Sequence, residues 1–369
     1  MDAKIVAFGA TGYTGRLVTA ALVARGHRPV LVGRSPTKLA ALAAEHGGLD
    51  TALADVSRPD SVRALLGPGD VLVSTVGPFA RHGAAAVEAA IDAGAHYVDS
   101  TGEAPFIRDV FERYGPRAAG AGSTLLTAFG YDYVPGNLTG ALALRAAGPA
   151  ARRVDIGYFL TGLAKMSSGT RASGLGAALV PHHTYRGGRL VAEPAMRRLG
   201  RFDCDGRTLV GGSVGATEQY TLPRFAPQLD EVGVYLGWLG GAVRGAQAAS
   251  YLTPVLSAVP ALGRLLDRGA ARLGTATGEG ADEAERSRGG SRFLAVARDA
   301  AGRPLATARV EGVDAYTLTG DLIAWAALRL AAGQVSGPGA LGPVDAFGLD
   351  ALEDGCREAG LDRIEVSAG

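Results

Sequence analysis

The sequence predicts an α/β protein: a doubly wound parallel sheet, followed by a second α+β domain built on a mainly antiparallel sheet. Three observations predict this fold class. Apolar runs alternate with helix-like segments up to residue 137, a glycine-rich run follows the first apolar run, and the pattern changes from residue 138 onward. A length of 369 residues also favours two domains over one.

The first part of the chain predicts six strands of a parallel sheet. The apolar runs lie at 4–8, 29–33, 50–55, 70–76, 96–100 and 123–129. Residues 15–26 and 82–95 between them have helical spacing. Near-continuous apolar strands that alternate with helices are typical of a parallel sheet covered on both faces. With right-handed crossovers, residues 1–137 are expected to form a Rossmann-type nucleotide-binding domain.

The middle of the chain predicts a different kind of domain, residues 138–315. Residues 152–162 and 231–240 alternate like strands with one wet face, and Asp205-Gly206 is a strong hairpin signal. A second hairpin is expected over 293–312. Helices on one face of these strands would make an α+β domain that covers the nucleotide cleft. Residues 274–290 are polar and glycine-rich and predict a surface loop, and 316–369 are expected to be a C-terminal helical segment.

Composition limits the classes of partner. The net charge of +1 argues against nucleic acid as a partner, and the two cysteines, Cys204 and Cys356, have no metal-ligand spacing. The start of the chain predicts a strand rather than a signal peptide, so a cytoplasmic protein is expected. The spacing of the two cysteines predicts no metal site. Residues 246–263 are uncharged, but Pro and polar residues interrupt them. They predict a buried or pocket-lining helix rather than stable membrane insertion.

The glycine-rich run is the principal candidate for a nucleotide site. It follows a strand and opens a helix, which is the setting that gives such a run its meaning. Its seven residues are Gly9, Ala10, Thr11, Gly12, Tyr13, Thr14 and Gly15. The first glycine permits the tight turn, the second lets the backbone approach a pyrophosphate, and the third allows close packing of helix and strand. Amides at the helix start favour the phosphate charge.

The end of the second strand indicates which dinucleotide binds. NAD-binding domains place an acidic residue there, whereas this chain has Gly33 and Arg34, followed by Ser35. Arg34 can pair with a 2′-phosphate, and Lys38 lies one helical turn further along. We therefore expect NADP(H) as the cofactor. Asp55, after the third strand, is expected either to reach the adenine amine or to cap the next segment.

Two further strand ends carry Gly, Pro and polar residues that core packing does not explain. In open α/β sheets, ligands lie beyond the carboxyl ends of the strands. A rigid loop alongside the nicotinamide and a second close backbone approach are expected there. The candidates are Thr75, Val76, Gly77, Pro78 and Phe79 after the fourth strand, and Ser100 and Gly102 after the fifth.

Together, GATGYTG, the GRS after strand two, STVGPF, YVDSTGE and FGYDYVPGN resemble the saccharopine dehydrogenase-like oxidoreductases, in particular their actinobacterial branch of trans-acting enoyl reductases. The resemblance is strong over 1–145 and returns at 316–330 and 337–352. It implies NADP(H), two domains with the active site in their cleft, a C-terminal segment packed on the nucleotide domain, and often a dimer. It leaves the substrate open, because such enzymes act on C–N bonds or on C=C bonds.

Short-chain dehydrogenases, a nearby alternative, need a Tyr and a Lys four residues apart, and none of the eleven tyrosines has such a lysine. Proton donors are therefore sought in the loop after strand six, which is similar to the family's loop beside the nicotinamide. Tyr131 either donates a proton or packs on the cofactor, and Asp132 either takes part in catalysis or stabilises the loop. Substrate contacts are proposed for Tyr133, for His82 and for Glu103, the last two with helix capping or helix initiation as alternatives.

Residues 163–180 hold the remaining candidates. Ser168, Gly169 and Thr170 either cap a helix or lie over the substrate, and they resemble an SGGT-type element of enoyl reductase-like relatives. Lys165 is expected to hold a substrate carboxylate or phosphate, or to lie in solvent. The apolar, small residues of 238–263 suit either a tunnel for an acyl chain or a dimer interface.

The sequence therefore predicts an NADPH-dependent reductase acting on a small-molecule substrate, first of all on the C=C bond of an enoyl or polyketide-type substrate. Imine reduction, as in saccharopine formation, is the second enzymatic hypothesis, although no arginine cluster for a dicarboxylic amino acid is evident. A regulator that binds NADPH without turnover is the hypothesis from another class. It would need the glycine-rich run and Arg34 but no proton donor.

Overall fold

The fold is that of a computed structural model, which describes residues 3–162, 181–238, 240–251 and 280–368. Lys165, Ser168, Gly169 and Thr170 lie outside the described residues, as do half of the predicted tunnel and the first part of the predicted 274–290 loop. The chain forms two compact units. The first comprises Met1–Gly102, Phe106–Val134 and Ala315–Gly360; the second comprises Glu103–Pro105, Pro135–Asp314 and Leu361–Gly369.

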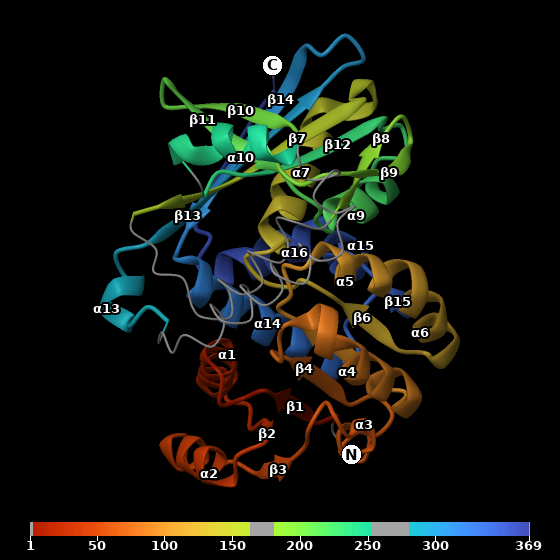
Figure 1. The fold of residues 1–369 in the computed structure, drawn as a ribbon, viewed down its shortest axis with the longest axis vertical. Helices are drawn as coiled ribbons and strands as arrows, with labels where there is room; N and C mark the ends of the chain where they lie inside the picture. Colours follow the sequence, from red (N-terminus) through yellow and green to blue (C-terminus); the bar gives the residue numbers. More distant parts are fainter. Residues whose placement is uncertain (1–2, 163–180, 239, 252–279, 369) are drawn as a thin grey trace. The chain divides into compact units, whose positions relative to one another are not determined.

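A parallel sheet of seven strands forms the centre of the first unit (Figure 1). The strands are β1 (Ile5–Phe8), β2 (Val30–Gly33), β3 (Thr51–Leu53), β4 (Val71–Ser74), β5 (His96–Asp99), β6 (Thr124–Leu126) and β15 (Gly339–Ala340). Their order in the sheet is β15-β6-β5-β4-β1-β2-β3. The predicted doubly wound sheet is thus confirmed. Its seventh strand has only two residues and could not be found from an apolar run.

Helices cover both faces of this sheet. They are α1 (Tyr13–Ala24), α2 (Pro36–Glu45), α3 (Pro59–Arg63), α4 (Phe79–Ala93), α5 (Ala104–Asp109), α6 (Gly115–Ala121), α14 (Ala315–Ala331), α15 (Pro343–Phe347) and α16 (Leu349–Glu358), with a π-helical turn at Val110–Tyr114. In Figure 1, α1 and α2 lie on one side of the sheet and α3, α4 and α6 on the other. Burial on both sides explains why β1 is apolar throughout and why β4 is apolar up to its last residue, Ser74.

The helix α14 packs against α1 within the first unit. Gly320 permits the approach, because a Cβ there would lie 3.1 Å from the Leu17 Cβ. Most apolar side chains of α14 are buried, and Leu318 and Leu322 are fully buried. Residues far apart in the sequence therefore build one nucleotide-type unit, and the C-terminal part of the chain contributes to it.

The second unit is built on a mixed sheet. Its strands are β7 (Arg153–Thr161), β8 (His182–Arg186), β9 (Arg189–Glu193), β10 (Leu199–Cys204), β11 (Arg207–Ser213), β12 (Glu231–Leu236), β13 (Gly290–Arg298), β14 (Pro304–Gly312) and β16 (Arg363–Ala368). The main path is β10-β11-β12-β7-β13-β14-β16, with β8 and β9 off it. Its helices include α7 (Val134–Ala147), α9 (Glu218–Phe225), α10 (Val243–Ser250) and α13 (Glu283–Arg286).

Most predicted features of this sheet are confirmed. Asp205 and Gly206 join β10 to β11 with φ angles of 53° and 72°, the positive values that a two-residue hairpin turn requires. The strands β13 and β14 form the second predicted hairpin. One expectation needs correction at the centre of the sheet, because β7 and β12 pair in parallel. Several strands separate these two along the chain, so the pairing left no hairpin signal in the sequence.

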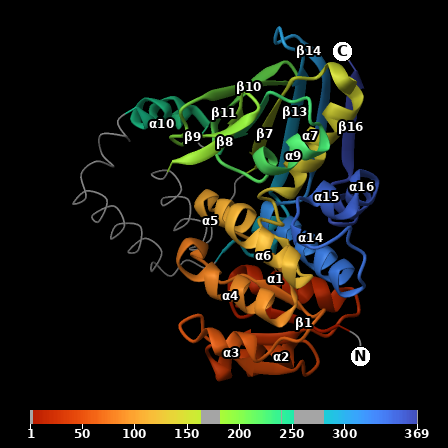
Figure 2. The same cartoon turned by 90° about the vertical axis from the view of Figure 1, so that its right-hand side faces the viewer.

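The end of the chain differs from the expected helical segment. Residues 363–368 form β16, which pairs antiparallel with β14 beside the chain terminus (Figure 2). Ile364 and Val366 alternate with charged and small residues there, a period-two pattern that suits a strand. The boundaries of the compact units fall at 134/135, 314/315 and 360/361 rather than at 137/138 and 315/316. Among the described residues, no helix is both long enough and apolar enough to span a membrane.

Candidate functional site at the carboxyl ends of the parallel strands

The glycine-rich run forms a tightly packed turn between β1 and α1. Gly9 has a φ angle of +86°, and a Cβ there would lie 2.8 Å from the Thr75 Oγ1. A Cβ at Gly15 would overlap the Gly9 carbonyl oxygen and would lie 2.8 Å from the Ala10 Cα. The turn therefore needs glycine at both positions, one for its backbone conformation and one for the close approach of the helix.

The first turn of α1 has no side-chain cap. Gly12 is the N-cap residue, with an extended backbone, and its N–H donates to the Gly9 carbonyl oxygen at 2.9 Å. A Cβ at Gly12 would lie only 3.2 Å from that same oxygen. Because no described side chain caps this helix start with a hydrogen bond, its N–H groups can receive an anionic group. Tyr13 contacts Tyr316 of α14 edge-to-face, with ring centroids 5.0 Å apart.

The end of β2 presents two cations. Arg34 and Lys38 are both exposed. Ser35 is the N-cap of α2, and its Oγ accepts the Lys38 N–H at 3.4 Å. Gly33 lies close to Thr11 of the glycine-rich run, with 3.8 Å between the position of its Cβ and the Thr11 Oγ1. A phosphate beside this turn would therefore meet two positive charges, and no carboxylate stands at the strand end.

Asp55 has the role of a turn residue. Its Oδ1 accepts the N–H of Ser57 at 2.8 Å. This hydrogen bond is the main reason that the pKa of Asp55 lies below its ordinary value, and the charges of Arg34 and Arg58 lower it further. This hydrogen bond fits the capping role that the sequence left open, and the contact with the adenine amine stays a prediction. The influence of Arg34 also shows that the ends of β2 and β3 lie near each other.

The end of β4 is tied to the glycine-rich run. The Thr75 hydroxyl lies 3.2 Å from the carbonyl oxygens of both Phe8 and Gly9. Val76, Gly77 and Pro78 lead into α4, and the Gly77–Pro78 peptide is cis. Phe79 is buried and packs on Phe106, with ring centroids 5.7 Å apart. The structure thus gives Phe79 a core role beneath the loop, whereas Val76 to Pro78 are partly or fully exposed.

Asp132 is the most unusual polar group at this edge of the sheet. Its Oδ1 is buried, and no described residue hydrogen-bonds to it. A Cβ at Gly102 would lie 2.9 Å from the Asp132 Oδ2, so the loop after β5 touches the loop after β6. Burial raises the pKa of Asp132 to about 7. At neutral pH this carboxyl group therefore holds a proton for a large part of the time.

The loop that carries Asp132 is held from two sides. The N–H of Tyr131 donates to the Thr319 Oγ1 of α14 at 3.0 Å. Tyr133 N–H donates to the Ala128 carbonyl oxygen at 2.6 Å. Both tyrosine side chains are buried, and the Asp132–Tyr133 peptide is cis. The predicted catalytic loop is thus an ordered part of the first unit.

Two functional candidates were missed by sequence reasoning. Asp99, at the end of β5, accepts hydrogen bonds from the loops after both β5 and β6. The sequence signal that could have identified Asp99 was a carboxylate in an otherwise apolar strand. Thr319 lies almost two hundred residues from Tyr131 along the chain, and no local pattern connects them.

The other predicted substrate residues are spread over both units. His82 is half-buried in the first turn of α4, which begins at Phe79. Glu103 is buried directly before α5 and belongs to the second unit. Ser100, which directly follows β5, is half-buried. Gly102, Asp132 and Tyr131 belong to the first unit, together with the glycine-rich run.

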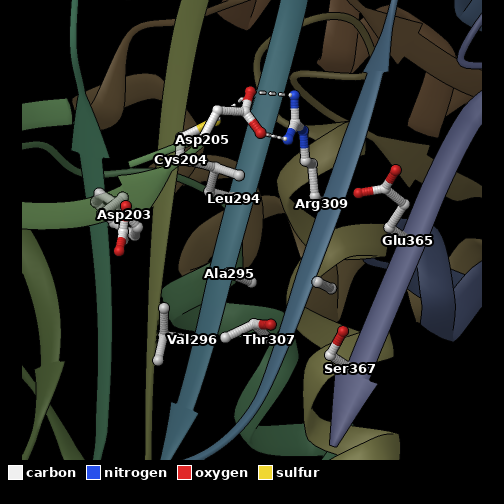
Figure 3. A pocket seen from close by; sticks show the side chains of 12 residues that line it. Asp203, Cys204, Asp205, Leu294, Ala295, Val296, Thr307, Arg309, Glu365 and Ser367 are labelled. Atoms are coloured by element: carbon white, nitrogen blue, oxygen red, sulfur yellow. Dashed lines mark hydrogen bonds and ion pairs between the residues drawn. The ribbon is translucent and has the colours of Figure 1, made fainter. Parts of the chain in front are cut away.

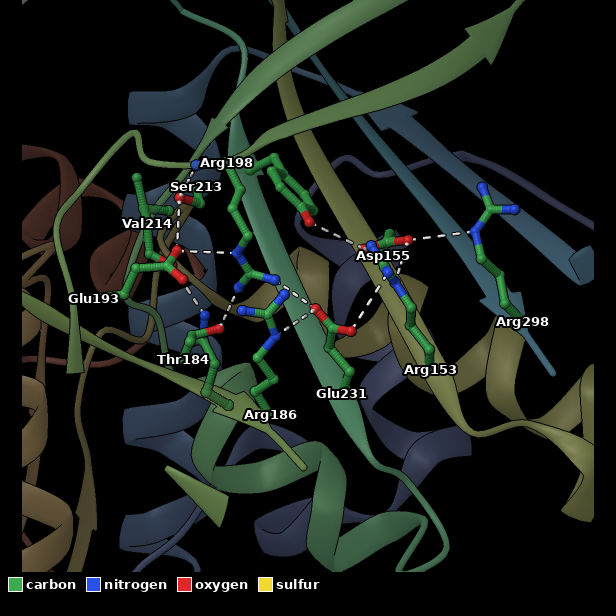
Figure 4. A network of polar contacts seen from close by, with 12 residues as sticks. Arg153, Asp155, Thr184, Arg186, Glu193, Arg198, Ser213, Val214, Glu231 and Arg298 are labelled. Atoms are coloured by element: carbon green, nitrogen blue, oxygen red, sulfur yellow. Dashed lines mark hydrogen bonds and ion pairs between the residues drawn. The ribbon is translucent and has the colours of Figure 1, made fainter. Parts of the chain in front are cut away.

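The arginines at the centre of the second unit are paired within the chain (Figure 4). Arg198 binds Glu193 at 3.0 Å and also binds Glu231, and Arg153 binds Asp155 at 2.8 Å. Arg298 binds the same Asp155 at 3.3 Å. Since these guanidinium groups already have carboxylate partners, this cluster does not offer a free site for an acidic substrate.

A pocket of about 170 Å³ opens on the same unit, over β13, β14 and β16 (Figure 3). Arg309 and Asp205 form a two-point ion pair across it, with distances of 2.7 and 3.0 Å. Cys204 and Glu365 also line it. None of the predicted site residues is among its lining residues, so this pocket is separate from the strand-end site.

A parallel sheet, a crowded glycine turn before an uncapped helix, and two cations at the end of β2 define a dinucleotide-binding domain. Residues 5–126 match the sequence profile of the saccharopine dehydrogenase NADP-binding domain. This match over about a third of the chain agrees with the resemblance carried by its motifs, and the prediction of NADP as the cofactor type is confirmed.

Curated relatives and a solved structure are also similar to this chain. A trans-acting enoyl reductase of Mycobacterium ulcerans (strain Agy99) is 36% identical over 141 residues, which cover 37% of this chain and 34% of that protein. A trans-acting enoyl reductase of Mycobacterium tuberculosis (strain ATCC 25618 / H37Rv) is 36% identical over 140 residues, again 34% of its length. The match thus spans about a third of these relatives. Apo saccharopine dehydrogenase (L-Glu forming) from Saccharomyces cerevisiae has a similar fold, with a TM-score of 0.61 over 99% of both chains at 15% identity.

Proposed function

We propose that this protein is an NADPH-dependent reductase that acts on the C=C bond of an enoyl or polyketide-type acyl substrate. The observation that carries the proposal is the Asp132 carboxyl group of a half-buried residue, whose Oδ1 is buried and has no described hydrogen-bond partner, at the same edge of the sheet as the nucleotide turn. A reductase needs a proton source beside its hydride source, and this group holds a proton near neutral pH. The names of the mycobacterial relatives support the enoyl substrate class.

The residues present fit NADP(H). Gly9, Gly12 and Gly15 let the backbone come close to a pyrophosphate, and the uncapped start of α1 favours its charge. Arg34 and Lys38 are exposed where the 2′-phosphate would lie. When bound, NADPH supplies the hydride. The loop after β4, which Thr75 ties to the glycine turn, would orient the nicotinamide end.

Asp132 is the proposed proton donor. Its burial favours the neutral, protonated carboxyl group, because a charge without solvent or partners is costly. From this state it can pass a proton to the carbon that becomes negative after hydride transfer, and it then regains a proton from solvent. Tyr131, in the same loop, is the alternative donor; its backbone is fixed by Thr319. Lys165, Ser168 and Thr170 remain proposed substrate contacts.

The nucleotide part of the proposal is tested by titrating the protein with NADPH and NADH and following the fluorescence of Trp238 and Trp325. For Arg34→Ala we expect NADPH to bind about 10–100 times more weakly, because a hydrogen-bonded contact to a charged group contributes roughly 1.5–3 kcal/mol. NADH binding should stay unchanged. Arg108→Ala, an exposed arginine paired with Glu112 on α5, is the matched control. Equal weakening of NADPH and NADH, or none, would contradict the assignment.

The reaction is tested with a crotonyl thioester of N-acetylcysteamine and, separately, with a cyclic imine. The proposal expects NADPH oxidation with the thioester and formation of the saturated product. Turnover of the imine alone would favour the imine reductase hypothesis. Binding of NADPH without turnover of either compound would favour a regulator. A homodimer and a cytoplasmic location remain predictions, to be checked by sedimentation and by localisation.

A further inference from the structure

We infer that Asp99 is a positioning residue of the reductase: its carboxylate holds the loop after β6 in the conformation that places Asp132 against Gly102. This inference rests on the proposed function, because it assigns Asp99 a role through the proposed proton donor. Asp99 itself is fully buried at the end of β5.

Asp99 connects two strand-end loops through four hydrogen bonds. Its Oδ1 accepts the N–H of Thr101 at 2.8 Å and that of Ala128 at 2.9 Å. Its Oδ2 accepts the Thr127 hydroxyl at 2.9 Å, and its carbonyl oxygen accepts the Phe129 N–H at 2.8 Å. Thr101 directly precedes Gly102, and Ala128 opens the loop that contains Asp132. One side chain therefore sets the separation of the two backbone segments that meet at Asp132.

The Asp99 carboxylate holds an unusual backbone conformation at Ala128. Ala128 has a φ angle of +55°, in the left-handed region that a residue with a Cβ rarely adopts. Such a conformation is strained for a residue with a Cβ and persists only where the surroundings impose it. The Ala128 N–H is held by the Asp99 Oδ1 and its carbonyl oxygen by the Tyr133 N–H. Asp132 lies between these fixed points, so its position depends on them.

The two carboxyl groups have opposite surroundings. The Asp99 carboxylate accepts three hydrogen bonds, which favour its ionised form, although burial raises its pKa to about 6. The Asp132 Oδ1 accepts no hydrogen bond from a described residue. The Asp132 carboxyl group therefore favours its protonated form. Tyr97, on the same strand as Asp99, keeps its proton because burial and the Asp99 charge raise its pKa well above 10. Asp99 is thus suited to accept hydrogen bonds, and Asp132 to hold a proton.

The test compares Asp99→Asn with Asp70→Asn in the full-length protein. Asp70 is a buried carboxylate at the opposite, amino-terminal edge of the same sheet, and it accepts the N–H groups of Lys4 and Gly67. With the crotonyl thioester, Asp99→Asn should lower kcat about 100-fold, because a displacement of Asp132 by about 1 Å has an effect of this size. The Kd for NADPH should change by no more than about twofold. Asp70→Asn should lower the thermal stability without changing kcat.

Thr127 provides a second, milder pair of variants. Thr127→Val removes the hydroxyl that donates to Asp99 and keeps the side-chain shape, whereas Thr127→Ser keeps the hydroxyl. We expect the valine variant to lose kcat and the serine variant to recover most of it. If Asp99→Asn does not fold, this pair still decides the question. Equal activity of the two Thr127 variants, or unchanged kcat in folded Asp99→Asn, would overturn the inference.

A readout without substrate separates this inference from the proposed function. The carboxyl carbon of Asp132 is titrated by ¹³C NMR in the wild type, in Asp99→Asn and in Asp70→Asn. If Asp99 fixes the loop, the pKa of Asp132 should fall toward its ordinary value in Asp99→Asn only, because the released loop admits water. If the wild type binds NADPH but reduces no enoyl thioester, the proposed function fails, and the NMR shift alone judges the positioning role. An unchanged pKa of Asp132 would then overturn it.

Discussion

At the scale of single residues, Asp132 differs from an ordinary loop aspartate in having a buried Oδ1 without a described partner. Aspartate commonly closes turns by accepting backbone N–H groups, as Asp55 does for Ser57. Asp132 does not use its Oδ1 in this way. The observation favours a chemical role over the turn-stabilising role, and the sequence had left both open.

The pH dependence of the reaction follows from the protonation of Asp132. Burial raises its pKa from 3.8 to about 7, so the proton-donating form is populated below that value and is lost as the pH rises through it. We therefore expect kcat with the crotonyl thioester to decrease above about pH 7. Asp132→Asn should lower kcat by about 100–10,000-fold and abolish this decrease, while NADPH binding persists.

Steady-state rates between pH 5 and 9 provide the check. A wild-type rate that increases through pH 7, or an Asp132→Asn variant with full activity, would exclude Asp132 as the proton donor. In that case Tyr131→Phe would show whether the neighbouring phenol supplies the proton.

At the scale of elements, α1 can approach the glycine turn closely only because Gly15 has no side chain. Gly15→Ala should destabilise the fold by about 1–3 kcal/mol and weaken NADPH binding, because its Cβ would overlap the Gly9 carbonyl oxygen and push α1 away. Gly120→Ala is the control: this exposed glycine of α6 has nothing within 4 Å of its Cβ position. It should be neutral or stabilise by up to about 1 kcal/mol. Urea unfolding and NADPH titration measure both effects, and similar behaviour of the two variants would contradict the packing explanation.

The elements also show which features a sequence can predict. The six apolar strands and the Asp205-Gly206 hairpin were predictable, because burial on two faces and a two-residue turn each leave a local pattern. The strand β15 has only two residues and therefore no periodicity. The parallel pairing of β7 with β12, and the pairing of β16 with β14, depend on partners distant in the sequence.

The same distinction applies to the site. The glycine turn and Arg34 were found because their spacing from a strand end has a physical meaning. Phe79 was assigned to the cofactor site from its position alone, whereas the structure buries it against Phe106. Thr319 could not be found, because only the fold brings α14 to the loop after β6. The burial that raises the pKa of Asp132 is likewise a property of the packed unit and not of its local sequence.

At the scale of the whole molecule, two compact units share one chain that passes repeatedly between them. The loop FGYDYVPGN contains one of these passages, since Asp132 belongs to the first unit and Gly136 to the second. Gly136 lies against Tyr158 and Glu218 of the second unit, where a Cβ would overlap both side chains. The motif thus joins the proposed proton donor to the framework of the second unit within a few residues.

The central claim, hydride transfer from NADPH to a C=C bond, is tested most directly by isotope transfer. The protein is incubated with NADPH that carries deuterium at both C4 positions of the nicotinamide and with the crotonyl thioester of N-acetylcysteamine, and the product is analysed by mass spectrometry. We predict a saturated butyryl thioester that carries one deuterium from the cofactor. A protein that binds NADPH but gives no saturated product, or a product without the label, would contradict the claim.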